Sequence, residues 1–194
     1  MGNKAAVSID ESARVGENVK IGEGAAIKSG AIIGNGVVLG KNVKIGEDAI
    51  LDREVQIGDD VTVDSEVLIK GGAVIETGVV IGSKIKIGRK CFIQKCAVIE
   101  NSVVIGNEVA VGSRSRLHEG SKIGSRCIIK QEVEVGLSSV VGKNSRIGER
   151  ARIGGMAIIG SNTKIGKDVF LRDAVTVEDK THVFHLGAPA PSRE

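Results

Sequence analysis

The chain has 194 residues, a length typical of one domain, and carries a net charge of +3. With 27 Gly, 2 Pro, 3 Phe and neither Trp nor Tyr, its composition excludes an aromatic core, a collagen-like repeat and an aromatic platform for single-stranded nucleic acid. The longest uncharged stretch has 12 residues, from Ser29 to Gly40, which excludes a segment that could span a bilayer.

A six-residue repeat predicts the secondary structure. From Ile9 to Val183, every sixth residue is aliphatic, in 30 repeats without an insertion. The residue two places earlier, from Val7 to Thr181, is nearly always small, and the residue after the aliphatic one is Gly in 17 of the 30 repeats. Two inward residues around one outward residue indicate a short strand, and the Gly-rich triplet that follows indicates a corner. Such units cannot bury their inward face alone, so they must stack.

These repeats resemble a known family. Val19–Gly24, Val43–Asp48 and Val103–Glu108 are similar to the hexapeptide repeat of the bacterial transferases. The resemblance implies a left-handed parallel β-helix with three repeats per triangular coil. We therefore predict an all-β protein with a single solenoid of about ten coils and no inserted loops. Residues 1–6 are predicted to form a lead-in, 7–185 the β-helix and 186–194 a C-terminal tail, in which Leu186–Ala190 resembles the exit segment of family acyltransferases.

Three repeats per coil would place residue n beneath residue n+18, so the outward residues form three ladders. Two of these ladders are rich in large apolar side chains, and an apolar sheet face of that size favours an interface over open surface. Scattered surface aliphatics are the alternative. The resemblance implies a homotrimer, and the candidate contact residues are Ile32, Ile50, Leu68, Val104, Val140 and Ile158 on one ladder and Val74, Phe92 and Ile128 on another.

The resemblance also suggests a catalytic base. In acyltransferases of this family, a histidine takes a proton from the acceptor, which then attacks an acyl thioester. His118 occupies a corner position, and Glu100 lies one coil before it, where a carboxylate could orient the imidazole. We therefore name His118 and Glu100 as the candidate catalytic residues. The alternative is a solvated corner histidine beside an acidic neighbour.

The other two histidines indicate no further chemistry. His182 and His185 are near the C-terminus, where capping or tail roles are expected. His118 and His182 are 64 residues apart, which is not a multiple of 18, so they should not share a column. We therefore predict no metal site.

Charge is divided unevenly along the chain. Residues 1–83 have 8 basic and 13 acidic residues, whereas residues 84–194 have 19 and 11. The basic half could hold the phosphates of coenzyme A or an acidic carrier protein, with Arg146, Arg152 and Lys164 as candidate contacts. A solvated surface, with Arg116, Glu134 and Arg152 as a salt-bridge ladder, is the alternative. No recognition helix accompanies the charge, so we expect no nucleic-acid partner.

Two function classes follow. The first is a hexapeptide-family acyltransferase that moves an acyl group, such as acetyl, from coenzyme A or a carrier protein to a hydroxyl or amine of a small acceptor. It would need no tightly bound cofactor, only a coenzyme A thioester as co-substrate. The second is a non-catalytic scaffold, assembly or regulatory subunit, which the uninterrupted repeats favour. Three cysteines without a CxxC motif, and no signal peptide, predict a cytoplasmic protein.

Overall fold

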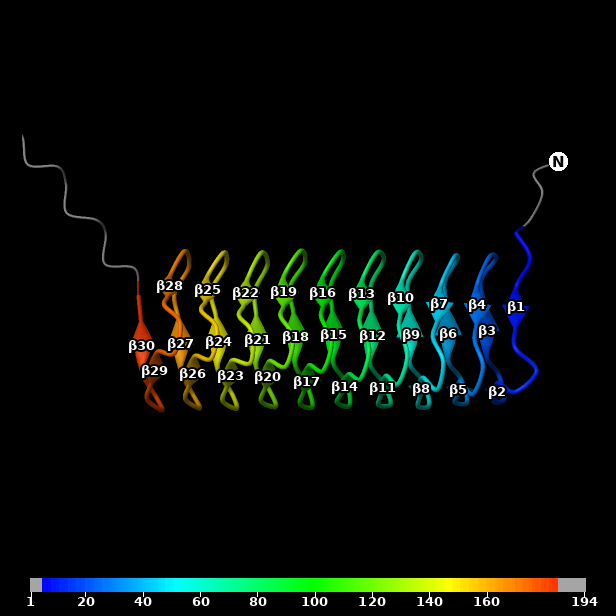
Figure 1. Ribbon diagram of the computed structural model, residues 1–194, viewed down its shortest axis with the longest axis horizontal. Coiled ribbons are helices and arrows are strands. Elements are labelled where there is room, and N and C mark those ends of the chain that lie inside the picture. Colours follow the sequence, from blue (N-terminus) through cyan, green and yellow to red (C-terminus); the bar gives the residue numbers. More distant parts are fainter. Residues whose placement is uncertain (1–4, 185–194) are drawn as a thin grey trace, which may run out of the picture.

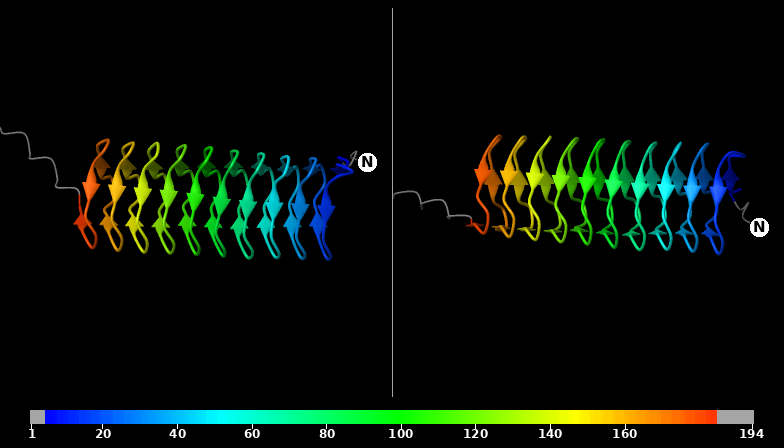
Figure 2. Two further views of the ribbon diagram at one scale, coloured as in Figure 1. Left: turned by 60° about the horizontal axis from the view of Figure 1, so that its bottom comes forward. Right: turned by 90° about the horizontal axis from the view of Figure 1, so that it is seen from below.

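A computed structural model describes residues 5–184, and in it the repeats wind into a straight solenoid (Figure 1). Each repeat forms one strand of two residues, and strands three apart in sequence pair in parallel, so three sheets enclose the core. In every pair, residue n lies beside residue n+18, as Arg116 does beside Glu134. The predicted all-β solenoid of ten coils is confirmed. Figure 2 shows that no loop protrudes from the stack.

The strands are named here by sheet. The first sheet contains β1 (Ser8–Ile9), β4 (Ala26–Ile27), β7 (Lys44–Ile45), β10 (Thr62–Val63), β13 (Val80–Ile81), β16 (Val98–Ile99), β19 (Arg116–Leu117), β22 (Glu134–Val135), β25 (Arg152–Ile153) and β28 (Phe170–Leu171). The second contains β2 (Arg14–Val15), β5 (Ile32–Ile33), β8 (Ile50–Leu51), β11 (Leu68–Ile69), β14 (Lys86–Ile87), β17 (Val104–Ile105), β20 (Lys122–Ile123), β23 (Val140–Val141), β26 (Ile158–Ile159) and β29 (Thr176–Val177). The third contains β3 (Lys20–Ile21), β6 (Val38–Leu39), β9 (Gln56–Ile57), β12 (Val74–Ile75), β15 (Phe92–Ile93), β18 (Ala110–Val111), β21 (Ile128–Ile129), β24 (Arg146–Ile147), β27 (Lys164–Ile165) and β30 (His182–Val183).

Each corner has three residues, and glycine is needed mainly at the first. A Cβ atom on Gly136, a first corner residue, would lie 2.6 Å from the backbone of Gly154 in the next coil. The third corner residue is the one with a left-handed backbone: within residues 5–184, φ is positive at 22 non-glycine residues, such as Asn144, and at six glycines. The glycines are therefore at the predicted corners, but most of them are there because adjacent coils approach closely.

The core is a thin column of aliphatic side chains. The repeated Ile, Val and Leu pack against the small inward residues, and nearly all are buried from Ala25 to Val177. The first coil is more open, with Val7, Ile9 and Val15 exposed. A core this narrow explains why the sequence has so few aromatic residues.

Large apolar side chains also lie on the outside of the sheets. Exposed members of the predicted contact set are Ile32, Ile50, Val104, Val140 and Ile158 on the second sheet and Phe92 and Ile128 on the third, while Leu68 and Val74 are partly buried. Five exposed aliphatics make the second sheet the more apolar of these two faces. Over the described part of the chain there is no helix long and apolar enough to cross a membrane. The C-terminal tail over 186–194, with its exit-like segment, lies outside the described residues.

Candidate functional site

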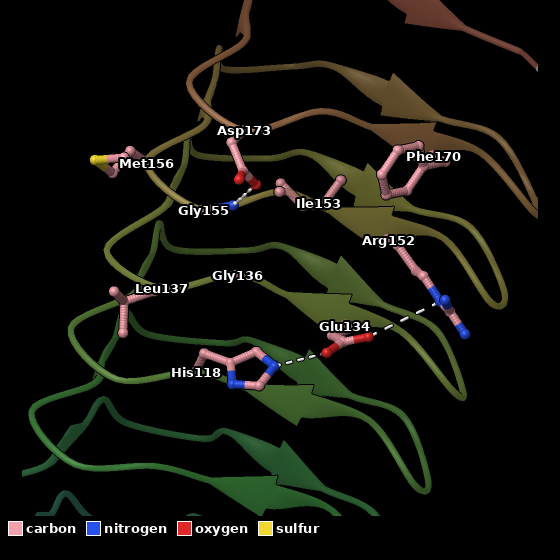
Figure 3. A pocket seen from close by; sticks show the side chains of 11 residues that line it. His118, Glu134, Gly136, Leu137, Arg152, Ile153, Gly155, Met156, Phe170 and Asp173 are labelled. Carbon is pink, nitrogen blue, oxygen red and sulfur yellow. Dashed lines mark hydrogen bonds and ion pairs between the residues drawn. The ribbon is translucent and has the colours of Figure 1, made fainter.

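A hollow of about 480 Å³ opens on one edge of the prism, along the corners that join the first sheet to the second. We call this the His118 edge. Its floor is bare because Gly136 and Gly154 occupy the two corner positions that follow His118 in the column. Figure 3 shows Leu137 and Met156 on the corner side of the hollow, and Glu134, Arg152 and Phe170 on the strand side. Two stacked glycines therefore form the floor of this cleft, and the side chains around them form its walls.

The apolar walls of this cleft are unusually exposed. Phe170 is 67% exposed, Met156 63% and Leu137 54%, more than any aliphatic on the flat sheet faces of the described chain. Asp173 is at the far end, where its carboxylate accepts a hydrogen bond from the backbone N–H of Gly155 at 2.7 Å. A cleft with a polar end and apolar sides suits a ligand that is itself part polar and part apolar.

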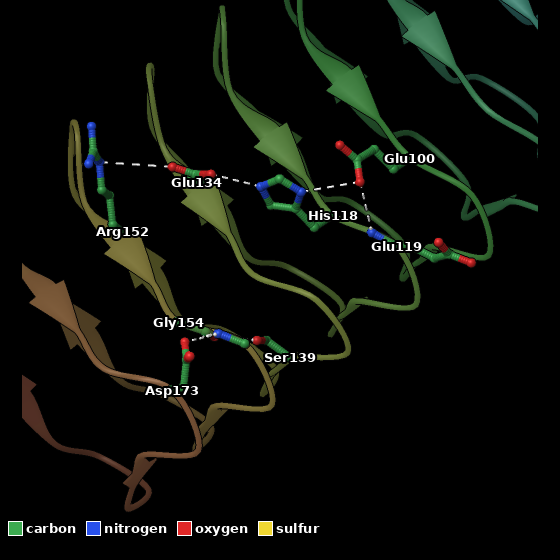
Figure 4. Close-up of polar contacts among 9 residues, drawn as sticks. Glu100, His118, Glu119, Glu134, Ser139, Arg152, Gly154 and Asp173 are labelled. Atoms are coloured by element: carbon green, nitrogen blue, oxygen red, sulfur yellow. Dashed lines mark hydrogen bonds and ion pairs between the residues drawn. The ribbon is translucent and has the colours of Figure 1, made fainter.

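His118 is at the other end of the cleft and contacts two carboxylates. Its Nδ1 atom is 3.1 Å from an oxygen of Glu100, the residue predicted from the column, and its Nε2 atom is 2.8 Å from an oxygen of Glu134 (Figure 4). Glu100 also accepts a hydrogen bond from the backbone N–H of Glu119 at 3.3 Å. The His118 side chain is only 24% exposed, so its ring is held rather than free in solvent.

Glu134 was not predicted as a partner of His118. It is on β22, 16 residues after His118, so it belongs to the ladder beside the corner column rather than to the column itself. Its second oxygen is 3.9 Å from Nε of Arg152. No ion pair joins Glu134 to Arg116 within residues 5–184, so the three-residue ladder proposed as an alternative forms only in part. A corner side chain can also reach the outward residue of the next strand in the sheet it follows, which is 16 residues later in the sequence. That spacing is the signal in the sequence that points to Glu134.

The three candidate anion-binding residues fall on two faces. Arg152 lines the cleft, while Arg146 and Lys164 lie next to each other on β24 and β27 of the third sheet. That sheet is opposite the His118 edge, because each edge of a triangular prism faces the sheet that does not form it. One chain therefore does not bring all three residues to His118.

The remaining candidate ligands lie elsewhere. His182 continues the third-sheet ladder after Lys164, and its ring packs edge-on against Phe184. His185 lies outside the described residues. Among the residues that the structure describes, no group of three or more His, Cys, Asp or Glu side chains is arranged to hold a metal ion.

Comparison with known proteins supports the fold and the repeat. Residues 12–47 match the model described as bacterial transferase hexapeptide (six repeats), and residues 97–183 match the GMPPB C-terminal domain. No curated protein sequence matches the chain.

Three solved structures share the solenoid. UDP-N-acetylglucosamine O-acyltransferase of Moraxella catarrhalis is 17% identical, with a TM-score of 0.66 over 86% of this chain and 69% of that one. LpxA of Acinetobacter baumannii is 18% identical, with a TM-score of 0.55, and the Arabidopsis UDP-N-acetylglucosamine acyltransferase is 18% identical, with a TM-score of 0.51. Each of these two matches covers 89% of this chain and 69% of the other.

Identities this low establish a common fold and carry no substrate with them. About a third of each relative has no counterpart in the aligned region. The assignment of the hexapeptide repeat has three sources that agree: the six-residue period of the sequence, the matched family model and the stacked coils of the structure. In its repeats the chain is similar to the bacterial transferase hexapeptide family, whose model matches residues 12–47, and it shares the fold of the acyltransferase structures named above.

Proposed function

We propose that the protein is an acyltransferase that moves an acyl group, such as acetyl, from a coenzyme A or carrier-protein thioester to a hydroxyl or amine. The observation that carries this proposal is His118, held by Glu100 at the end of an open cleft. The enzymes with the same fold named above are acyltransferases, which agrees with this reaction class.

In the proposed reaction, His118 acts as general base. Its Nε2 atom takes the proton of the acceptor, and the acceptor oxygen or nitrogen forms a bond to the thioester carbonyl carbon. When the carbon–sulfur bond breaks, the imidazolium returns that proton to the leaving thiolate. Glu100 at Nδ1 fixes the ring and stabilises its positive charge during the reaction.

The donor would be held by positive charge. Arg152 in the cleft could contact a phosphate of coenzyme A, while Arg146 and Lys164 face away from His118 of their own chain. A homotrimer would resolve this separation, since the third sheet of one protomer could lie beside the His118 edge of another. The exposed aliphatics of the second and third sheets support such an assembly. The three free thiols support a reducing, cytoplasmic location.

A scaffold or assembly subunit is the second candidate. It is favoured by one observation: between residues 5 and 184 every one of the 30 strands has two residues, and no loop interrupts the coils to close over the cleft. Loops that carry catalytic or binding residues are what an enzyme of this shape would be expected to add.

Calorimetry with acetyl-CoA, with coenzyme A and with an acyl carrier protein separates the two candidates. The enzyme should bind one donor saturably, and His118→Ala should abolish transfer while the thermal unfolding curve stays unchanged. Absence of binding to all three donors would favour the scaffold, and full activity of His118→Ala would remove that residue from the mechanism.

A further inference from the structure

The contact between His118 and Glu134 has a chemical consequence for the proposed base. A neutral imidazole carries one N–H and one lone pair, whereas an ionised carboxylate can only accept a hydrogen bond. Nδ1 is 3.1 Å from Glu100 and Nε2 is 2.8 Å from Glu134. Both contacts can be hydrogen bonds to ionised carboxylates only if both ring nitrogens carry a proton. In that state the ring has no lone pair with which to accept the proton of an acceptor.

The other charged groups around the ring do not supply a competing acceptor. The Glu119 side chain is exposed and points away from the ring in Figure 4, and its backbone N–H binds Glu100. Arg116, on the strand that leads into the His118 corner, is exposed. Arg152 reaches Glu134 rather than the ring, and Asp173, at the far end of the cleft, binds the Gly155 N–H. Glu134 is therefore the group that occupies Nε2.

The Glu134 carboxylate also has an alternative partner, Arg152. Its side chain is 46% exposed, and its second oxygen already lies 3.9 Å from Nε of Arg152. A small rotation of the carboxylate would exchange the His118 contact for a closer pair with Arg152. By contrast, Glu100 is fixed by both the ring and a backbone N–H. The two carboxylates thus differ: one orients the ring and the other is exchangeable.

We propose that Glu134 is a positioning residue that gates His118. While it contacts Nε2 it holds the ring doubly protonated and inactive as a base, and its turn toward Arg152 releases Nε2 to the acceptor. This inference rests on the proposed function for its catalytic consequence. The protonation of the ring can be measured in the free protein, whether or not the protein is an enzyme.

The test compares Glu134→Gln with Glu119→Gln, a matched control that removes a nearby negative charge from a side chain that does not contact the ring. Nitrogen-15 NMR of histidine-labelled protein at pH 7 reports each ring nitrogen, and His118→Gln assigns the signals. We expect two protonated nitrogens for His118 in the wild type and in Glu119→Gln. In Glu134→Gln one nitrogen should become unprotonated, because the amide can donate to it. An unprotonated nitrogen in the wild type, or two protonated nitrogens in Glu134→Gln, would overturn the gate.

The catalytic arm uses acetyl-CoA with water as acceptor and follows the released thiol. Below pH 7, Glu134→Gln should raise kcat several-fold with KM unchanged, while Glu119→Gln should match the wild type. A loss of kcat in Glu134→Gln would show that Glu134 assists the reaction and would contradict gating. If no form of the protein releases thiol, the proposed function has failed in this assay, and the NMR result still decides whether Glu134 controls the ring.

Discussion

The hydroxyl of Ser139 donates a hydrogen bond to the backbone carbonyl of Gly154, 2.6 Å away and 15 residues further along the chain. The same offset recurs at five other small polar residues on the inward side. The pairs are Cys91 with Gly106, Ser115 with Lys130, Cys127 with Gly142, Ser145 with Gly160 and Thr163 with Glu178. These six inward residues therefore donate hydrogen bonds to corner carbonyls of the next coil.

Ser121 is the buried hydroxyl without such a partner in the described chain, and it forms a matched pair with Ser139. Ser139→Ala should lower the free energy of unfolding by about 1 to 3 kcal/mol, since it leaves both the partly buried Gly154 carbonyl and the buried Ala157 N–H without their partner. Ser121→Ala should be neutral or stabilising, because it removes a hydroxyl that is already unpaired. Urea denaturation of both variants measures the difference, and equal losses would contradict this assignment.

Glycine at the first and third corner positions should respond differently to substitution. Gly136→Ala should destabilise the fold by about 1 to 3 kcal/mol, since its Cβ would lie 2.6 Å from backbone atoms of the next coil. Gly72→Asn should cost less than about 1 kcal/mol. Gly72 has φ of +70°, and its nearest neighbour would be a flexible Lys90 carbon at 3.5 Å. Thermal melts of the two variants measure the difference. A larger drop in melting temperature for Gly72→Asn would show that backbone conformation, rather than the spacing between coils, selects glycine.

The three thiols should differ in reactivity according to their burial. Cys96 is exposed, whereas burial raises the pKa of both Cys91 and Cys127. In the folded protein at pH 8, a disulfide reagent should therefore modify one thiol quickly and two only on unfolding. Three equally fast thiols would contradict the buried placement.

The raised pKa values of Cys91 and Cys127 should also make the stability of the fold depend on pH in the alkaline range. Because the folded chain holds these two thiol protons more tightly than the unfolded chain, stability should fall as pH rises above about 8.5, where an ordinary thiol ionises. Denaturant titrations between pH 7 and 10 measure this fall. The fall should be smaller in Cys127→Ser, and an unchanged slope in that variant would remove Cys127 as its source.

The proposed assembly places an aliphatic sheet face in a subunit contact. Ile158→Asp on the second sheet should shift the solution mass from trimer toward monomer, because a buried unpaired carboxylate is costly. Val80→Asp on the first sheet makes the same change at a residue of similar exposure and should leave the mass unchanged. Analytical ultracentrifugation at micromolar concentration measures both. A wild-type monomer would exclude the trimer.

The fold could be predicted from the sequence because every repeat meets nearly the same surroundings. An inward aliphatic recurs in every repeat, and the inward residue two places earlier is small in every repeat but that of Ile85. The assignment of one repeat is therefore supported by the repeats on either side of it. The third corner residue could not be recognised in this way. It has a positive φ in residues as different as Asn144, Glu132 and Met156, which shows that stacking enforces the corner against local preference.

Only part of the candidate site could be predicted from the sequence. Glu100 follows from stacking, since it is 18 residues before His118, while Glu134 depends on the direction in which a corner side chain leans toward the adjacent ladder. The floor of the cleft is formed by Gly136 and Gly154, which in the sequence look like any other corner glycine. The offset of 18 residues identifies side chains that stack directly, such as Glu100 and His118, but not diagonal neighbours such as Glu134.

The strand pairing has a consequence for how this protein can vary in length. Within the part of the chain that the structure describes, each strand pairs only with the strand three before it and the strand three after it. Eighteen residues are therefore a unit that can be removed or duplicated, because the two ends left behind have the same spacing, sheet and inward residues. The coils before Glu100 then act as a spacer, and adding or removing one would move the N-terminus by one rung without altering the cleft. A protein built this way can set the distance between its two ends independently of its chemistry.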